Sequence, residues 1–96
     1  MAHTVSYEDV LRVARAAQGR ELRTLTGRAG FRTEVVGDKL YVIPSSTGKR
    51  RFVGAGSRKA IERFNEVGSY SAADYQDVTF NSVYILRLIS LVKNGE

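Results

Sequence analysis

Apolar positions near the N-terminus recur every three or four residues, which is the spacing of one face of a helix. These positions are Tyr7, Val10, Leu11, Ala14 and Ala17. Ser6 precedes them and Asp9 follows it by three residues, which is the pattern of a capping box with Asp in place of the more usual Glu. Gly19 is suited to ending the helix. We therefore predict a helix from Tyr7 to Gln18, after a disordered tail over residues 1–5.

Between residues 31 and 53 the apolar positions change to period two, which is typical of strands. Phe31, Thr33 and Val35 lie on one face of a predicted strand, and Gly37-Asp38 forms a two-residue turn because glycine accepts the positive φ of hairpin turns. The chain returns as a second strand over 39–43, which ends at a proline that cannot donate to a ladder. A third strand is predicted over 49–53.

Residues 20–30 do not have a decisive pattern. Leu22 and Leu25 are compatible with a short strand or with a continuing turn. Gly27 and Gly30 break any long element. Both interpretations stay open at this point.

The last forty residues return to helical spacing. We predict a loop flanked by Gly54 and Gly56, and then a helix capped by Ser57 and ended by Gly68. A linker over 69–78 contains at most one turn, beginning near Ser71 and Asp74. A last helix, capped by Thr79 or Asn81, ends near Asn94.

The predicted order is α-β-β-β-α-α in a single α+β domain spanning residues 1–96. The three strands form an antiparallel sheet, and the helices pack on one face of it. The last helix is apolar around most of its circumference between Val83 and Val92. It is either the central helix of the core or a helix that joins a second subunit in a homodimer.

Composition narrows the class of protein. The chain has no cysteine, so disulfides and thiolate metal sites are excluded. The first four residues lack the features of a signal peptide. The longest apolar stretch is too short to span a bilayer. We expect a soluble, cytoplasmic protein with no membrane partner.

The distribution of charge is the most informative chemical feature. The segment from Arg20 to Arg63 holds eleven of the fifteen Lys and Arg residues against four acids, whereas the whole chain is +5. Such a concentration of positive charge attracts polyanions, among which nucleic acid is the most common in cells.

Within this segment three groups are candidate nucleic-acid contacts. The connection between the second and third strands supplies Ser46, Thr47, Lys49, Arg50 and Arg51, with the two arginines as base readers in a major groove. The start of the second helix adds Arg58 and Lys59, where a phosphate could meet free amide groups. The Gly-containing segment that leads into the first predicted strand adds Arg28 and Arg32. Solubilising surface charge is the alternative for each group.

Two aromatic residues leave a second alternative open. Tyr41 could lie on the exposed face of the sheet and form a stacking platform with Arg32 or Arg51. Alternatively, Tyr41 and Phe52 could pack in the core.

The residues offer little for catalysis. The single histidine, His3, lies in the predicted tail, and Asp74 and Asp77 fit caps and turns better than a metal site. The Ser46-Thr47-Gly48-Lys49 stretch lacks the first glycine of a phosphate-binding loop. We expect no enzyme activity, no cofactor and no metal.

The sequence thus predicts a non-enzymatic nucleic-acid-binding module, with duplex DNA favoured over RNA. Three strands followed by a helix are similar in topology to the small sheet-type DNA readers attached to integrases. One alternative is an accessory protein of the phage or defence-system type that binds an acidic protein. A third hypothesis comes from the similar element order of small RNA-cleaving bacterial toxins, but these need a histidine on the sheet that this chain lacks.

Overall fold

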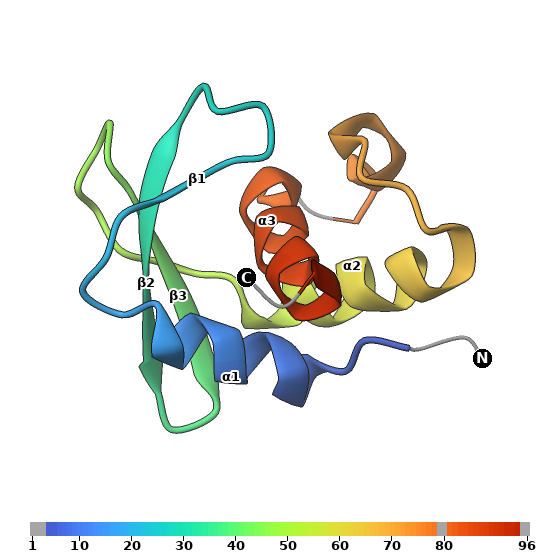
Figure 1. Ribbon diagram of the computed structural model, residues 1–96, viewed down its shortest axis with the longest axis horizontal. Helices are drawn as coiled ribbons and strands as arrows, with labels where there is room; N and C mark the ends of the chain where they lie inside the picture. The colour runs from blue at the N-terminus through green and yellow to red at the C-terminus, as the bar shows by residue number, and fades with distance from the viewer. Residues whose placement is uncertain (1–3, 79–80, 95–96) are drawn as a thin grey trace.

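The computed structural model describes residues 4–78 and 81–94 (Figure 1). Its central element is a four-stranded antiparallel sheet in the order β1-β2-β3-β4. The strands are β1 (Leu22–Arg23), β2 (Gly30–Val36), β3 (Lys39–Pro44) and β4 (Arg51–Phe52). The prediction of an antiparallel α+β domain is confirmed, and the predicted number of three strands is wrong.

The additional strand, β1, has two residues. Leu22 pairs with Phe31 and Arg23 pairs with Gly30. Two residues cannot display a period-two pattern, so β1 is formed by its pairing with β2 rather than by a local preference. The predicted strand over 49–53 is shorter in the structure, because only Arg51 and Phe52 pair with β3.

The hairpin of β2 and β3 agrees with the prediction. Gly37 has a φ of 63°, and Val36 pairs with Lys39 across the two-residue turn. The register gives the two faces of the sheet different environments. The inner face carries Phe31, Thr33, Leu40 and Val42, all buried.

Helix α1 (Tyr7–Ala16) lies across this inner face (Figure 1). The predicted capping box is present, because the Asp9 amide donates to Ser6 Oγ at 3.0 Å and the Ser6 amide donates to Asp9 Oδ2 at 3.1 Å. Thr33 Oγ1 donates to the Ala14 carbonyl oxygen at 2.8 Å in the buried interface. This bond joins the helix directly to the sheet.

Helix α2 (Gly54–Val67) has Val53 as its N-cap and begins four residues before its predicted start. Ser57 is therefore not its cap: it is fully buried, and its Oγ donates to the Val53 carbonyl oxygen at 2.5 Å. Gly54 and Gly56 belong to the first turn rather than to a loop. Their low helix propensity is overridden by tertiary packing. Gly68, with a φ of 67°, ends the helix as expected.

A single 3₁₀ turn, η1 (Ala72–Tyr75), follows at the predicted place, and helix α3 (Ser82–Asn94) completes the fold. The Asn81 carbonyl oxygen accepts bonds from the amides of Tyr84 and Ile85 at the start of α3. Thr79, the other predicted cap, lies outside the described residues.

Helix α3 is the central helix of the core. Ile85, Leu88 and Ile89 have no exposed surface, and α3 packs against both α1 and α2. Among the large apolar residues of α3, Val83 alone is more than a third exposed, at 37%. This helix therefore fits the first of its two predicted roles, the central helix of the core, and presents little surface for the alternative, a homodimer. None of the described helices is long and apolar enough to cross a membrane.

Candidate nucleic-acid interface

The outer face of the sheet is not covered by any of the described helices, all of which lie on the other side (Figure 1). The alternation of the strands assigns side chains to it: Arg23, Arg32, Glu34, Val36, Lys39, Tyr41, Ile43 and Phe52. Arg32, Val36, Lys39 and Phe52 are exposed. This open surface combines cations with aromatic and aliphatic groups.

Two aromatic rings meet on the outer face. The ring centroids of Tyr41 and Phe52 are 5.6 Å apart and the rings are inclined by 59°, which is a favourable aromatic geometry. Tyr41 is partly buried, whereas 55% of Phe52 is exposed. The core alternative is therefore wrong for Phe52, and Tyr41 lies beside it on the outer face, partly buried.

Arg50 lies over this pair. Its guanidinium carbon is 4.3 Å from the centroid of the Tyr41 ring, within the range of a cation–π contact. Its Nη1 also donates to Glu34 Oε1 at 2.9 Å. The hydrogen bond and the charge of Glu34 raise the pKa of Arg50. The platform partner is thus Arg50, and not Arg32 or Arg51 as predicted.

Gly54 connects this pair to a third ring. A Cβ at Gly54 would lie 2.7 Å from Phe52 Cζ and 3.4 Å from Tyr7 Oη. Tyr7 donates from Oη to the Asp38 carbonyl oxygen, and Arg58 lies 4.0 Å above its ring centroid. Burial raises the pKa of the Tyr7 phenol, with the Arg58 charge opposing this rise.

We call the three rings of Tyr41, Phe52 and Tyr7 the aromatic row. It runs from the outer face past β4, an edge strand, to the start of α1. Arg50 caps the ring at one end and Arg58 caps the ring at the other. Arg50 and Arg58, two predicted contacts from separate elements, therefore each lie over an aromatic ring. Phe52 packs against Tyr41, and the edge of its ring and the Tyr7 hydroxyl both lie close to Gly54.

Four other predicted residues gather at one end of the sheet. The loops over 24–29 and 45–50 lie together there, because Phe31 pairs with Pro44 and the Ser45 amide donates to the Gly30 carbonyl oxygen at 2.9 Å. Figure 1 shows both loops beyond the same strand ends. Their exposed side chains include Arg28, Ser46, Thr47 and Lys49. Arg32 continues this group onto the outer face.

Arg51 and Lys59 do not contribute to the outer face of the sheet as predicted. Arg51 pairs with Val42 and so points to the opposite side of β4 from Phe52, where its Nη1 lies 3.4 Å from Asn81 Oδ1. Arg51 and Arg50 therefore do not form an adjacent pair of base readers. Because α2 starts at Gly54, Arg58 and Lys59 lie in its second turn. They are therefore not beside the free amide groups of the first turn, where the predicted phosphate contact was placed.

The sequence interpretation missed Gly54 and Tyr7 as parts of the site. The helical spacing placed Tyr7 on the apolar face of the first helix. This spacing does not show that the Tyr7 hydroxyl reaches the β2–β3 turn. The signal for Gly54 is its position two residues after Phe52, where a small residue leaves space for the ring. That signal requires knowledge of where the strand ends.

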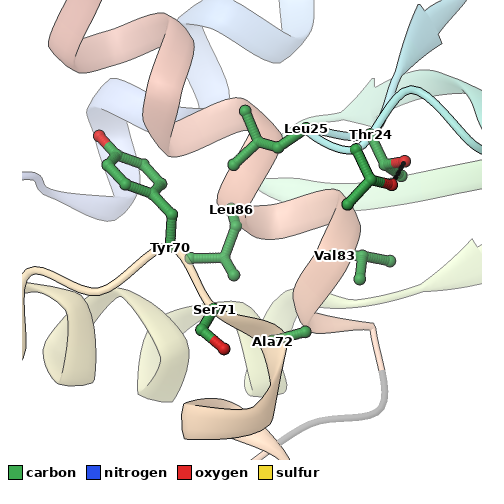
Figure 2. Close-up of a pocket in the computed structure, with 8 residues that line it drawn as sticks. Thr24, Leu25, Tyr70, Ser71, Ala72, Val83 and Leu86 are labelled. Carbon is green, nitrogen blue, oxygen red and sulfur yellow. Dashed lines mark hydrogen bonds between the residues drawn. The ribbon is translucent and has the colours of Figure 1, made fainter.

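A separate apolar hollow lies on the helix side of the sheet. It has a volume of about 210 Å³ and is lined by residues of the β1–β2 loop, the α2–η1 region and α3. Figure 2 shows Leu25, Tyr70 and Leu86 around it, with Val83 on the same helix as Leu86. Leu25, Tyr70 and Val83 are exposed large apolar residues.

Within residues 4–78 and 81–94, no cluster of three or more acidic or histidine side chains could hold a metal ion. Asp77 pairs with Arg63, which donates to both carboxylate oxygens at 3.2 and 2.9 Å. Asp74 accepts a hydrogen bond from Ser69 Oγ. Both acids therefore have hydrogen-bond partners, although Asp77 forms an ion pair with Arg63 rather than the predicted cap or turn.

In the comparisons with known proteins, no family model, no curated protein and no solved structure matches this chain.

Proposed function

We propose that this protein is a non-enzymatic nucleic-acid-binding module that uses the outer face of its sheet. The observation that carries the proposal is the exposed Phe52 ring beside Tyr41 and Arg50 on a face that no described helix covers. Exposed aromatic rings next to cations provide stacking for bases and charge for phosphates.

The charge of the outer face supports a polyanionic ligand. Arg23, Arg32, Lys39 and Arg50 belong to this face or lie over it, whereas its acids are Glu34 and Glu21, which reaches Ser45 Oγ at 2.6 Å. Phosphate contacts by such cations supply most of the sequence-independent affinity of nucleic-acid binders. Arg28 and Lys49, in the two loops at one end of the sheet, extend the positive charge of the outer face.

Solubilising charge alone does not account for this arrangement. Cations that protect a sheet from aggregation are expected on edge strands. Arg50, however, lies over the ring of Tyr41, which is on the inner strand β3. A large exposed ring such as Phe52 also lowers solubility rather than raising it. The combination is better explained by a ligand with both charge and flat apolar surface.

Fluorescence-anisotropy titration at two salt concentrations tests the proposal. A labelled mixed-sequence DNA should bind, with an affinity that falls steeply as salt rises. Arg32→Ala/Lys49→Ala should weaken binding about 10-fold or more. Arg12→Ala/Lys59→Ala removes the same charge from α1 and α2 and is the matched control. Absence of binding by the wild type at low salt would contradict the proposal.

A second candidate function, binding of an acidic protein, is favoured by the apolar hollow. Its exposed Leu25 lies in the loop that also carries Arg28, and Arg23 immediately precedes this loop. An apolar side chain flanked by acids on a partner would match this chemistry. Leu25→Asp would weaken the binding of such a partner protein and leave the affinity for nucleic acid nearly unchanged.

A further inference from the structure

We propose that the outer face binds single-stranded DNA in preference to duplex, with an unpaired base stacked on Phe52. This inference rests on the proposed function and specifies the form of nucleic acid. Its basis is the geometry of the aromatic row rather than the total charge.

Phe52 is the ring available for stacking. The Arg50 guanidinium occupies a position 4.3 Å from the Tyr41 centroid, and the Arg58 guanidinium a position 4.0 Å from the Tyr7 centroid. Each of these rings therefore already has a cation over it. Phe52 lies between them along the row, is 55% exposed, and has no cation within such a contact in the described structure.

The position of the Phe52 ring is held from two directions. Tyr41 packs against it at 5.6 Å, and its far edge occupies the space above Gly54. A ring fixed in this way loses little side-chain entropy when a base stacks on it. The contact is therefore pre-organised.

Unpaired bases fit this site better than a duplex does. A base in a duplex has its flat surfaces covered by its neighbours, so stacking on a protein ring requires that the base leave the helix. Phe52 is on the sheet and not at the tip of a protruding loop, so it cannot wedge between base pairs without close approach of the whole face. A single strand has accessible bases and needs no such step.

The cations around Phe52 suit a flexible phosphate backbone. Arg50 lies on one side of the ring and Arg58 on the other, beyond Tyr7. Arg50 is held by Glu34 through an exposed ion pair, which costs little to exchange for a phosphate. The backbone of a strand that crosses Phe52 would meet a guanidinium on each side.

The neutral side chains of the face favour DNA over RNA. Preference for RNA requires a partner for the 2′-hydroxyl. Apart from the Tyr41 hydroxyl, the neutral groups beside Phe52 on this face, Ile43 and Val36, have no polar atoms. The hydroxyls of Ser45 and Tyr7 already donate to Glu21 and to the Asp38 carbonyl oxygen.

The test compares three labelled oligonucleotides of the same mixed sequence: single-stranded DNA, single-stranded RNA and a DNA duplex. We expect single-stranded DNA to bind at least about 10-fold more tightly than the duplex and more tightly than the RNA. Phe52→Ala should weaken binding of the single strand about 5- to 100-fold, the range for loss of one stacked base. It should change duplex affinity much less.

Matched variants separate stacking from general apolar contact. Phe52→Leu keeps an apolar side chain without a ring and should behave like Phe52→Ala, whereas Phe52→Tyr should retain affinity. Val36→Ala removes another exposed apolar side chain (51% exposed) from the same face and should have little effect. Circular dichroism verifies the fold of each variant.

The outcomes distinguish this inference from the proposed function. Equal, salt-sensitive binding of duplex and single strand that Phe52→Ala and Phe52→Leu leave unchanged would overturn the inference and retain nucleic-acid binding. Tighter binding of RNA than of DNA would overturn the assignment to DNA. Binding of none of the three at low salt would overturn both.

Discussion

Asn65 and Val5 form two hydrogen bonds with each other across sixty residues of chain. The Val5 amide donates to Asn65 Oδ1 at 2.9 Å, and Asn65 Nδ2 donates to the Val5 carbonyl oxygen at 2.8 Å. The side-chain amide thus pairs with the backbone as a neighbouring strand would. It attaches the segment before α1 to α2, and Val5, which we had placed in a disordered tail, is buried.

We expect Asn65→Ala to reduce the free energy of unfolding by about 1–3 kcal/mol, because both backbone groups of Val5 lose their partner. Urea unfolding followed by circular dichroism measures the effect. Glu66→Ala, at the next position and exposed, is the control and should stay within about 0.5 kcal/mol of the wild type. Equal stability of the two variants would show that the pairing does not hold this segment.

The start of α2 can be tested by placing a carboxylate at two serines. Ser6 is an exposed N-cap, a position where Asp is as favourable as Ser, so Ser6→Asp should change stability by no more than about 0.5 kcal/mol. Ser57 is fully buried within α2, so Ser57→Asp should cost more than about 2 kcal/mol or prevent folding. If Ser57 were the cap, as its sequence context indicates, both variants would be equally stable. Thermal unfolding of the pair measures this difference.

Removal of one acid from the outer face should strengthen nucleic-acid binding. Glu34→Gln removes the carboxylate that pairs with Arg50 and leaves that guanidinium available for phosphate. We expect about a two- to five-fold gain in affinity for single-stranded DNA, in line with the small energy of exposed ion pairs. Glu62→Gln makes the same change of charge on α2 and should have less effect in the anisotropy assay. A loss of affinity in Glu34→Gln would mean that Glu34 is needed to hold Arg50 in its binding position.

The Arg63–Asp77 pair predicts a pH dependence of stability at acid pH. The hydrogen bonds from Arg63 lower the pKa of Asp77 below its ordinary value of 3.8. The pair therefore stabilises the fold above that value, and its contribution is lost as pH falls through the lower pKa of the folded state. Two-dimensional NMR titration should find the Asp77 midpoint below 3.8 in the wild type and closer to 3.8 in Arg63→Ala. An unchanged midpoint in Arg63→Ala would rule out this origin of the shift.

Sequence pattern predicted the elements that satisfy a local rule over many residues. The capping box at Ser6 and Asp9, and the alternation of Phe31, Thr33 and Val35 before Gly37, are rules of this kind. The hairpin formed as expected, and the helix begins at Tyr7 as predicted but ends at Ala16 rather than Gln18. The short strand β1 could not be assigned in this way, because its two residues become a strand only through Phe31 and Gly30 on β2. Strand β4 also has only two paired residues, so its bounds could not be predicted from a local pattern either.

The errors in the candidate site come from tertiary contacts that override local preference. Ser57 has the sequence of a cap, but the chain becomes helical at Gly54, where the absence of a side chain leaves room for the Phe52 ring. Arg50 and Arg51 are adjacent in sequence, and the strand sends them to different surfaces. Clustering of charge along the sequence therefore did not determine which cations share a face; the pairing of the strands did.

The close approach of Phe52 to Gly54 has an evolutionary consequence. Any side chain at position 54 would displace the ring from its place beside Tyr41, while the rest of the fold could form around the displaced ring, which is 55% exposed. Selection on folding alone would thus tolerate alanine or serine there, whereas selection on the position of the ring would not. In diverged sequences with this fold, we expect glycine at position 54 wherever position 52 is aromatic. Where position 52 is not aromatic, we expect position 54 to vary freely. Covariation of these two positions would record a constraint on ligand contact that measurements of stability do not detect.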